Sequence, residues 1–384
     1  MSRTIDHPLT ASVTMSDQPA AIAPLLPDRR RLTLRLAVVA AVLGGLALAV
    51  SSLPGLGEVR DRLADASLTW LAFGLVLQAA SVLAFIAVFR GVYARRMPWR
   101  LGLAVGTAAQ GTNALLPAGG ASGLALGAVA LRRTGLSAEH LGRRSVALYV
   151  LTSSVNFFTA VLAGGLLALG ILSGGPPLAL SAGPALAAVL AIAVVLTLPR
   201  LLRNVAAQPR GGRAGRLFGA GSAALADGIV DARDIVRAGN VGAIAGAVGY
   251  MAFDLAALTA AFAAIGDVPP IGVLMLAYVL GQLGGLIPVP GGVGGADGGL
   301  IAALVLYGTP LGIAAAAVLA YRVFQLGLPA LLGAIAMIRL PGILERAPDL
   351  SFAVEPVARR RQDGHATRPL SAPLPACAGA SAAS

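Results

Sequence analysis

Three ionisable side chains stand inside long apolar stretches of the sequence: Asp254, Asp297 and Arg322. A charge at the centre of a lipid bilayer costs about 2.5–3.5 kcal/mol on insertion scales, so such residues avoid lipid and mark functional sites by default. Asp297 and Arg322 carry opposite charges and are interpreted in two ways. They pair with each other for structural reasons, or Arg322 holds a phosphate, which its planar fork of donors fits well. Asp254 is either an internal hydrogen-bond anchor or a proton carrier.

The stretch around Asp297, residues 281–300, is too rich in proline and glycine to form an uninterrupted helix. Proline lacks an amide donor and clashes with the preceding turn, and glycine has backbone freedom that a helix must give up. A break at membrane depth survives only inside protein or beside a water-filled cavity. The predicted hinge residues here are Pro288, Pro290, Gly291 and Gly292. A plain loop between two ordinary spans is the alternative.

A similar interruption occurs earlier, in residues 101–131, which contain no charge. Arginines flank this segment on both sides, so both of its ends should lie at the cytoplasmic face. Two full spans would need about 40 apolar residues, and the segment is shorter. We therefore expect a re-entrant hairpin of two half-helices, with Pro117, Gly119 and Gly120 at its tip.

Composition places the whole chain in a membrane. Of its 384 residues, 57% are hydrophobic and only 12% are charged, whereas soluble domains carry roughly 25% charged residues. The net charge of +12 comes from arginines that recur between apolar segments, which is typical of cytoplasmic loops, so nucleic-acid binding is rejected. The single Cys377 excludes an intrachain disulfide, and three scattered histidines make a metal site unexpected. No phosphate-binding loop motif occurs, and no cofactor is expected.

The arginine pattern predicts an all-α polytopic protein with both termini in the cytoplasm. It has six full spans and two re-entrant broken-helix hairpins. The second hairpin covers residues 271–307. The last span must begin outside in order to end in the cytoplasm, so this hairpin opens from the outer face, opposite to the first. The expected spans cover about residues 36–53, 67–89, 145–172, 178–199, 241–265 and 311–338.

The expected organisation is a disordered cytoplasmic tail over residues 1–34, a transmembrane domain over 35–340 and a second such tail over 341–384. Within the domain, residues 67–172 and 241–338 form two halves with the order span, hairpin, span. Because the hairpins are opposed, the halves are predicted to be an inverted repeat, as in many transporters. A shift of 172 residues places Gln110 on Gln282 and Gly119 on Gly291.

Between the halves, residues 200–238 are expected to hold a basic loop and an amphipathic helix. Helical spacing predicts an apolar face, which would carry Leu225, Ile229, Ala232 and Val236. This helix lies on the membrane surface or is a soluble linker helix.

Uncharged polar residues extend the candidate site. Gln110 and Asn113 belong to the first hairpin, and Gln282 belongs to the second. Together with Asp297 and Arg322 they are candidates for a substrate-binding groove. The alternative is that they form hydrogen bonds between helices.

Two groups of residues resemble one known family. The run from Pro288 to Asp297, followed by Tyr321 and Arg322, is similar to the membrane domain of lysylphosphatidylglycerol synthases and their stand-alone, flippase-like relatives. The stretches 113–120 and 132–137 resemble the first signature of that family. The family usually has Glu at the position of Asp297, and its first signature often carries an Arg and an acidic residue that are missing here. Polar chemistry is therefore expected mainly in the second hairpin.

The resemblance implies movement of a phospholipid or lipid-linked glycan between leaflets of the bacterial inner membrane. The soluble synthase domain is not expected, because the segment after the last span is short and has no globular pattern. With no acid–base pair or nucleophile evident, we expect a protein that is not an enzyme. Two alternatives stay open: a secondary transporter of a small solute or ion, and a non-catalytic membrane partner of an envelope-lipid enzyme. The oligomeric state is left undetermined.

Overall fold

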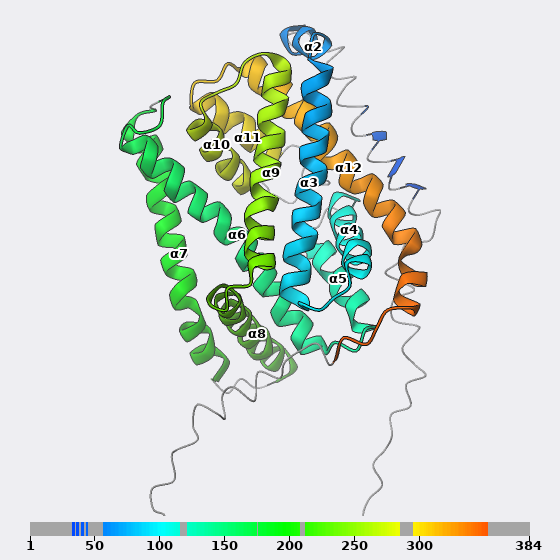
Figure 1. The fold of residues 1–384 in the computed structure, drawn as a ribbon. Coiled ribbons are helices and arrows are strands. Elements are labelled where there is room, and N and C mark those ends of the chain that lie inside the picture. Colours follow the sequence, from blue (N-terminus) through cyan, green and yellow to red (C-terminus); the bar gives the residue numbers. More distant parts are fainter. Residues whose placement is uncertain are drawn as a thin grey trace, which may run out of the picture.

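The computed structural model describes residues 57–115, 121–174, 176–207, 212–284 and 295–351, together with isolated positions between Thr33 and Gly44. Within these ranges every regular element is helical, as predicted (Figure 1). The helices are α2 Gly57–Ala64, α3 Leu68–Tyr93, α4 Trp99–Leu115, α5 Ala121–Arg132, α6 Ala138–Ala168, α7 Leu178–Ala207, α8 Gly212–Arg237, α9 Val241–Ile265, α10 Ile271–Gly284, α11 Gly295–Leu306 and α12 Leu311–Glu345.

Five helices in the described ranges, α3, α6, α7, α9 and α12, are long and apolar enough to cross a membrane. They correspond to five of the six predicted spans. The remaining one, residues 36–53, lies almost entirely outside the described residues. The helix α6 starts seven residues earlier than the predicted span, because Ser137 caps it by accepting a hydrogen bond from His140 N at 3.2 Å.

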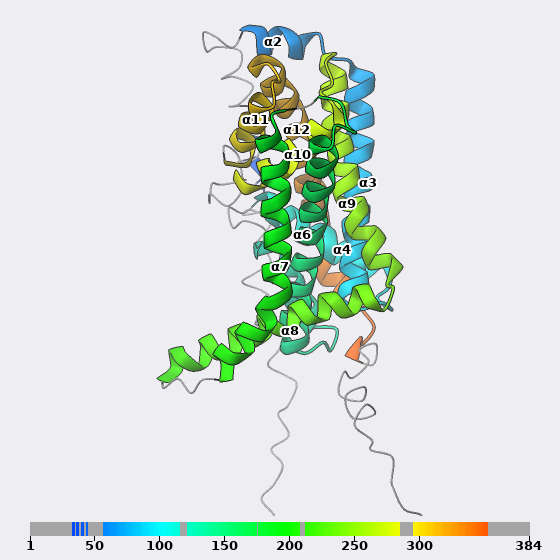
Figure 2. The same cartoon turned by 90° about the vertical axis from the view of Figure 1, so that its left-hand side faces the viewer.

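The helices α3 and α9 lie side by side and antiparallel along one side of the bundle (Figures 1 and 2). At one end Ser67 N donates to Ala264 O at 2.9 Å, and at the other Asn240 Nδ2 donates to Gly91 O at 2.9 Å. Between these ends Gly246 lies so close to the backbone of α3 at Val88 that a side chain there would overlap it. Small residues let two membrane helices approach closely, which increases their van der Waals contact.

The two helix pairs α4–α5 and α10–α11 occupy opposite ends of the bundle. In Figure 1 the first pair lies in the lower half and the second in the upper half. The longest of these four helices, α4, has 17 residues, which is about 26 Å at 1.5 Å per residue. That length is below the roughly 30 Å of a hydrocarbon core.

The tips of both pairs, residues 116–120 and 285–294, lie outside the described residues. They contain all the predicted hinge residues: Pro117, Gly119, Gly120, Pro288, Pro290, Gly291 and Gly292. Re-entrance of the hairpins and the inverted repeat therefore stay predictions.

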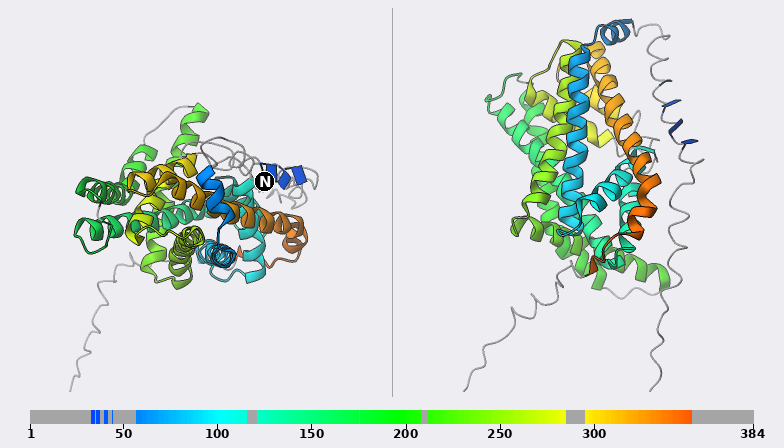
Figure 3. Two further views of the ribbon diagram at one scale, coloured as in Figure 1. Left: turned by 90° about the horizontal axis from the view of Figure 1, so that it is seen from above. Right: turned by 45° about the vertical axis from the view of Figure 1, so that its right-hand side comes forward.

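Each helix pair packs against the last span of the other half. The helix α4 packs chiefly on α12, and α10 packs on α6 (Figure 3). The contact between α4 and α12 is closest at Gly111 and Gly333, where a Cβ at either glycine would overlap the other's backbone. Pro329 O also lies close to Gly111.

We expect Gly333→Leu to separate α4 from α12, because the new side chain has no space beside Gly111. Overpacking of this kind typically costs about 1–3 kcal/mol, and thermal unfolding in detergent should show a clearly lowered midpoint. Gly327→Leu is the matched control on the same helix, since a Cβ there meets nothing within 4 Å. Equal midpoints for the two variants would contradict the close contact.

The amphipathic helix predicted within residues 200–238 is α8, which lies across one end of the bundle (Figure 2). Its buried face carries Ala226, Ile229, Ala232 and Ile235. The predicted face was therefore wrong at two positions, because Leu225 is 37% exposed and Val236 is 49% exposed. The apolar stripe is shifted because Asp231 also faces inward, within 3.4 Å of Arg143 Nη2 on α6.

A proline in α7 explains how α8 is held in place. Pro199 has no N–H, so the carbonyl of Val195, one turn earlier, lacks its usual helical donor. Arg233 Nη2 of α8 donates to that carbonyl at 3.0 Å and to Leu196 O at 2.5 Å. The carbonyl of Val195 therefore has a donor in place of the missing helical N–H.

The segment 57–64, which lies between the first two predicted spans, forms the short helix α2. Glu58 and Arg62 are paired one turn apart, with 3.1 Å between Oε1 and Nε. Val59 is buried against Ala316 at the start of α12. This helix thus covers one end of α12.

Candidate functional site

Asp297 and Arg322 form an ion pair, which is one of the two arrangements considered from the sequence. Asp297 is in the first turn of α11, and Arg322 is in α12. Arg322 Nε donates to Asp297 Oδ2 at 2.9 Å, and Nη2 lies 2.8 Å from the same oxygen. The helix dipole favours an acid in the first turn of α11. The carboxylate is thus stabilised both by its helix and by the guanidinium.

The pair is nearly enclosed by protein. The side chain of Arg322 is 8% exposed and that of Asp297 is 16% exposed. Arg322 Nη1 also donates to Gln325 Oε1 at 2.6 Å, one turn further along α12. Removing charges from water is expensive, and good geometry with further hydrogen bonds is needed to offset that cost. Two of the three guanidinium nitrogens of Arg322, Nε and Nη1, make such hydrogen bonds.

The third nitrogen, Nη2, has unused capacity. It is buried and, although close to Asp297, it has no partner with hydrogen-bond alignment in the described part of the chain. Gln78 Oε1 on α3 is a buried acceptor that also lacks a hydrogen-bond partner among the described residues. Buried polar atoms in native proteins are almost always satisfied by protein, water or a ligand. Among the described residues, therefore, Nη2 contacts only Asp297 and keeps a donor position without an aligned acceptor, and Gln78 Oε1 keeps an acceptor position without a donor.

Asp254 forms a second centre of polar contacts. It lies on α9 and is buried. Its Oδ2 accepts hydrogen bonds from Tyr278 Oη of α10 at 2.5 Å and from Tyr321 Oη of α12 at 2.6 Å. The amide of Gln78 also interacts with this carboxylate. Three other helices thus converge on one acid.

The two centres are neighbours. Tyr321 and Arg322 are adjacent on α12, and the charge of Arg322 acts on Asp254. Further contacts extend the network outward, since the side chain of Gln110 on α4 interacts with Tyr250 and that of Gln282 with Tyr278. We call this set the buried polar network after its buried centre, although Gln282 at its edge is exposed and Tyr250, Asp297 and Gln325 are partly buried. Its members are Gln78, Gln110, Tyr250, Asp254, Tyr278, Gln282, Asp297, Tyr321, Arg322 and Gln325.

Four of the five predicted substrate-binding residues belong to this network: Gln110, Gln282, Asp297 and Arg322. Asn113 has a different role in the structure. Its Oδ1 accepts from Gly123 N at 2.7 Å and from Ser122 Oγ at 3.3 Å. Asn113 therefore ties α4 to α5 within the first hairpin. Whether any of the five binds substrate stays a prediction.

The tyrosines were missed as site residues. Tyr250 and Tyr278 have no distinctive pattern in the sequence, and Tyr321 stood out only as part of the family motif. The one usable signal was Asp254 itself, because a buried acid needs donors from neighbouring helices.

The network contains two carboxyl groups and one guanidinium, and its remaining members are phenols and amides. No group of three or more His, Cys, Asp or Glu that could hold a metal ion occurs in the described residues. Such an arrangement can bind a polar or charged group and can hold a proton at a carboxyl oxygen.

The fold and this network define a multi-pass, all-helical membrane protein with a polar interior. The chain belongs to the family described as the lysylphosphatidylglycerol synthase TM region, whose model matches residues 32–333. This agrees with the resemblance in the two glycine- and proline-rich motifs. None of the curated proteins matches the chain.

Proposed function

We propose that this protein moves a phospholipid or a lipid-linked glycan between the leaflets of a bacterial inner membrane. The observation that carries the proposal is the buried Arg322, whose Nη2 has an unused donor position. A phosphate oxygen could accept a hydrogen bond from that nitrogen. A bidentate contact, which is typical of arginine, would also require Nε to leave Asp297 or Nη1 to leave Gln325. Membership of a family named for a lipid-modifying enzyme supports lipid as the substrate class.

The arrangement of the helices supports a mechanism of alternating access. The pairs α4–α5 and α10–α11 lie at opposite ends of the bundle (Figure 1). The buried polar network receives Gln110 from the first pair and Gln282 and Asp297 from the second. In our proposal the pairs are the re-entrant hairpins of an inverted repeat, and a headgroup passes between them while its tails stay in lipid.

Reconstitution tests the proposed activity. Purified protein is placed in liposomes that contain trace fluorescent lipids of several headgroup classes, and a membrane-impermeant reductant bleaches the outer leaflet. We expect bleaching beyond one half for at least one class, which means that inner-leaflet lipid reached the outside. Protein-free liposomes and liposomes with Arg322→Lys are the controls. Bleaching that stops at one half for every class would refute lipid movement.

A secondary transporter of a small polar solute is the second candidate, and the enclosure of the network favours it. Asp254 and Arg322 are both buried, as in a sealed central site. The same liposomes separate the candidates, because a solute transporter changes the contents of the lumen without moving labelled lipid. In neither case do we assign the protein an enzymatic reaction.

A further inference from the structure

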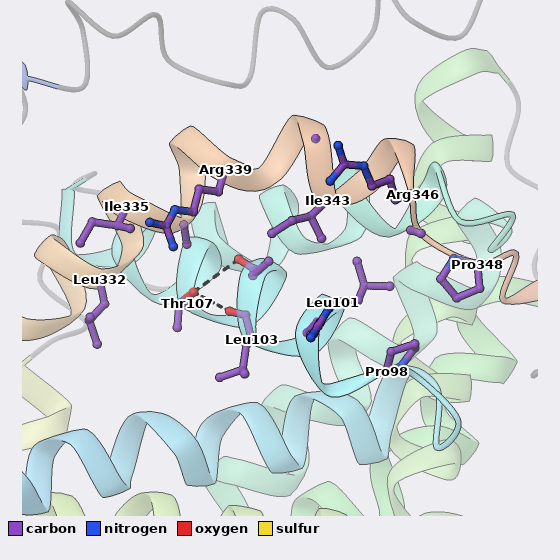
Figure 4. Close-up of a pocket in the computed structure, with 15 residues that line it drawn as sticks. Pro98, Leu101, Leu103, Thr107, Leu332, Ile335, Arg339, Ile343, Arg346 and Pro348 are labelled. Carbon is purple, nitrogen blue, oxygen red and sulfur yellow. Dashed lines mark hydrogen bonds between the residues drawn. The ribbon is translucent and has the colours of Figure 1, made fainter.

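A groove on the side of the bundle is separate from the buried polar network. It lies between the first half of α4 and the last part of α12, and its volume is about 650 Å³ (Figure 4). Leu101, Leu103 and Ala104 form part of the α4 wall, and Leu332 and Ile335 form part of the α12 wall. The walls are therefore mainly apolar.

The shape of the groove follows from helix packing. The helices α4 and α12 touch at Gly111 and Gly333. The residues that line the groove start at Thr107, one turn from Gly111, and at Leu332, next to Gly333, and they continue to Pro98 and Pro348. The two helices thus diverge from a tight glycine contact and leave an open wedge between them.

Three arginines line this wedge: Arg100, Arg339 and Arg346. Arg339 lies on α12, and Arg346 is the residue that caps this helix, seven positions or about two turns further on. Both lie on the same side of α12 as Ile343 (Figure 4). All three arginines are exposed. None of the residues lining the groove is acidic, and no described residue forms an ion pair with these arginines.

We propose that this groove binds one anionic phospholipid, with an acyl chain along the apolar walls and the phosphate at the three arginines. The volume is within the range of small-molecule sites, about 300–1,000 Å³. One end of the groove is lined by Pro98 and Arg100, which directly follow the basic pair Arg95 and Arg96 between α3 and α4. We expect that end to face the cytoplasm, where the leaflet is rich in anionic lipid.

This inference does not rest on the proposed translocation, because a protein that moves no lipid can still hold one in this groove. Binding is therefore measured by itself. Purified, delipidated protein in neutral detergent is titrated with phosphatidylglycerol or with phosphatidylcholine, and retained lipid is counted by native mass spectrometry. We expect one retained phosphatidylglycerol, bound at least ten times more tightly than phosphatidylcholine.

The triple variant Arg100→Gln, Arg339→Gln and Arg346→Gln tests the charge contribution. We expect this variant to bind phosphatidylglycerol at least ten times more weakly than the unmodified protein. The matched control replaces Arg96, Arg132 and Arg237, which are also exposed and form no ion pair among the described residues, and it changes the net charge equally. Equal affinity in the two triple variants would overturn the assignment, because it would leave only non-specific attraction to the basic end of the protein.

Gly342→Leu tests the apolar contribution. Gly342 lines the groove, and a Cβ there meets nothing within 4 Å, so the side chain should fill the wedge without disturbing the fold. We expect loss of the retained lipid, whereas Gly327→Leu, with equally open surroundings elsewhere on α12, should keep it. Full retention in Gly342→Leu would refute the proposal. Absence of lipid in the unmodified protein would do so too, and would indicate that another part of the chain occupies the groove.

Discussion

Replacement of Arg322 by alanine is expected to destabilise the protein by about 3–5 kcal/mol, because it leaves the carboxylate of Asp297 buried without its cation. Gln325 also loses the donor that now lies 2.6 Å from its Oε1. Thermal unfolding in detergent should show a large decrease of the midpoint. Arg132→Ala, at an exposed arginine without an ion pair among the described residues, should leave the midpoint nearly unchanged.

The double variant Asp297→Ala with Arg322→Ala separates structure from function. Because both charges are gone, much of the lost stability should return. If Arg322 also holds a lipid phosphate, the double variant folds but does not move lipid in the liposome assay. Arg322→Lys keeps the charge but loses the bidentate fork, so we expect a folded protein with strongly reduced transport. Transport at the unmodified rate in the double variant would leave the pair purely structural.

Replacement of Asp254 by alanine is expected to have the second largest effect, about 2–6 kcal/mol. The substitution leaves the hydroxyls of Tyr278 and Tyr321 without an acceptor, and each buried unsatisfied group costs about 1–3 kcal/mol. We expect a value near the lower limit, since polar groups in membrane proteins also find partners in the unfolded state. Tyr278→Phe and Tyr321→Phe each remove a single hydrogen bond and should cost less. A midpoint unchanged by Asp254→Ala would contradict this role.

Asp254→Asn distinguishes the two interpretations of this acid. Both tyrosines donate to one oxygen, Oδ2, and the amide oxygen of asparagine can take its place. An anchor should therefore tolerate asparagine, with stability and transport both close to normal. A proton carrier should not, because an amide cannot exchange the proton, and transport should fail in a folded protein. Measuring unfolding and lipid movement on the same preparation makes the two outcomes distinct.

The sequence predicted most of the helical architecture. Runs of apolar residues bounded by arginines indicate spans directly, and α9 matches its predicted range of 241–265. The limits of other helices were harder to predict where charges continue inside them. Arg143 and Arg144 were expected before the span, but they lie within α6, which begins after its Ser137 cap, and Asp231 of the distant α8 lies within 4 Å of both. That contact depends on tertiary packing and has no local signal.

The candidate site was predicted only in part, for a similar reason. Asp297 and Arg322 are opposite charges in apolar surroundings. Their pairing could be inferred because an unpaired charge inside the membrane costs free energy. The tyrosines around Asp254 could not, because Tyr278 and Tyr321 lie 24 and 67 residues away along the chain. Only the folded arrangement of α9, α10 and α12 brings them to one carboxylate.

The crossed packing of α4 on α12 has a consequence for synthesis of the protein. Gly111 and Gly333, which form that contact, are 222 residues apart in the chain. At roughly 5–20 residues per second, the ribosome makes Gly333 about 10–45 s after Gly111. During that interval the glycine face of α4 has no partner from its own chain. A truncated protein that ends before α12 should therefore expose this face permanently and become a substrate for membrane proteases.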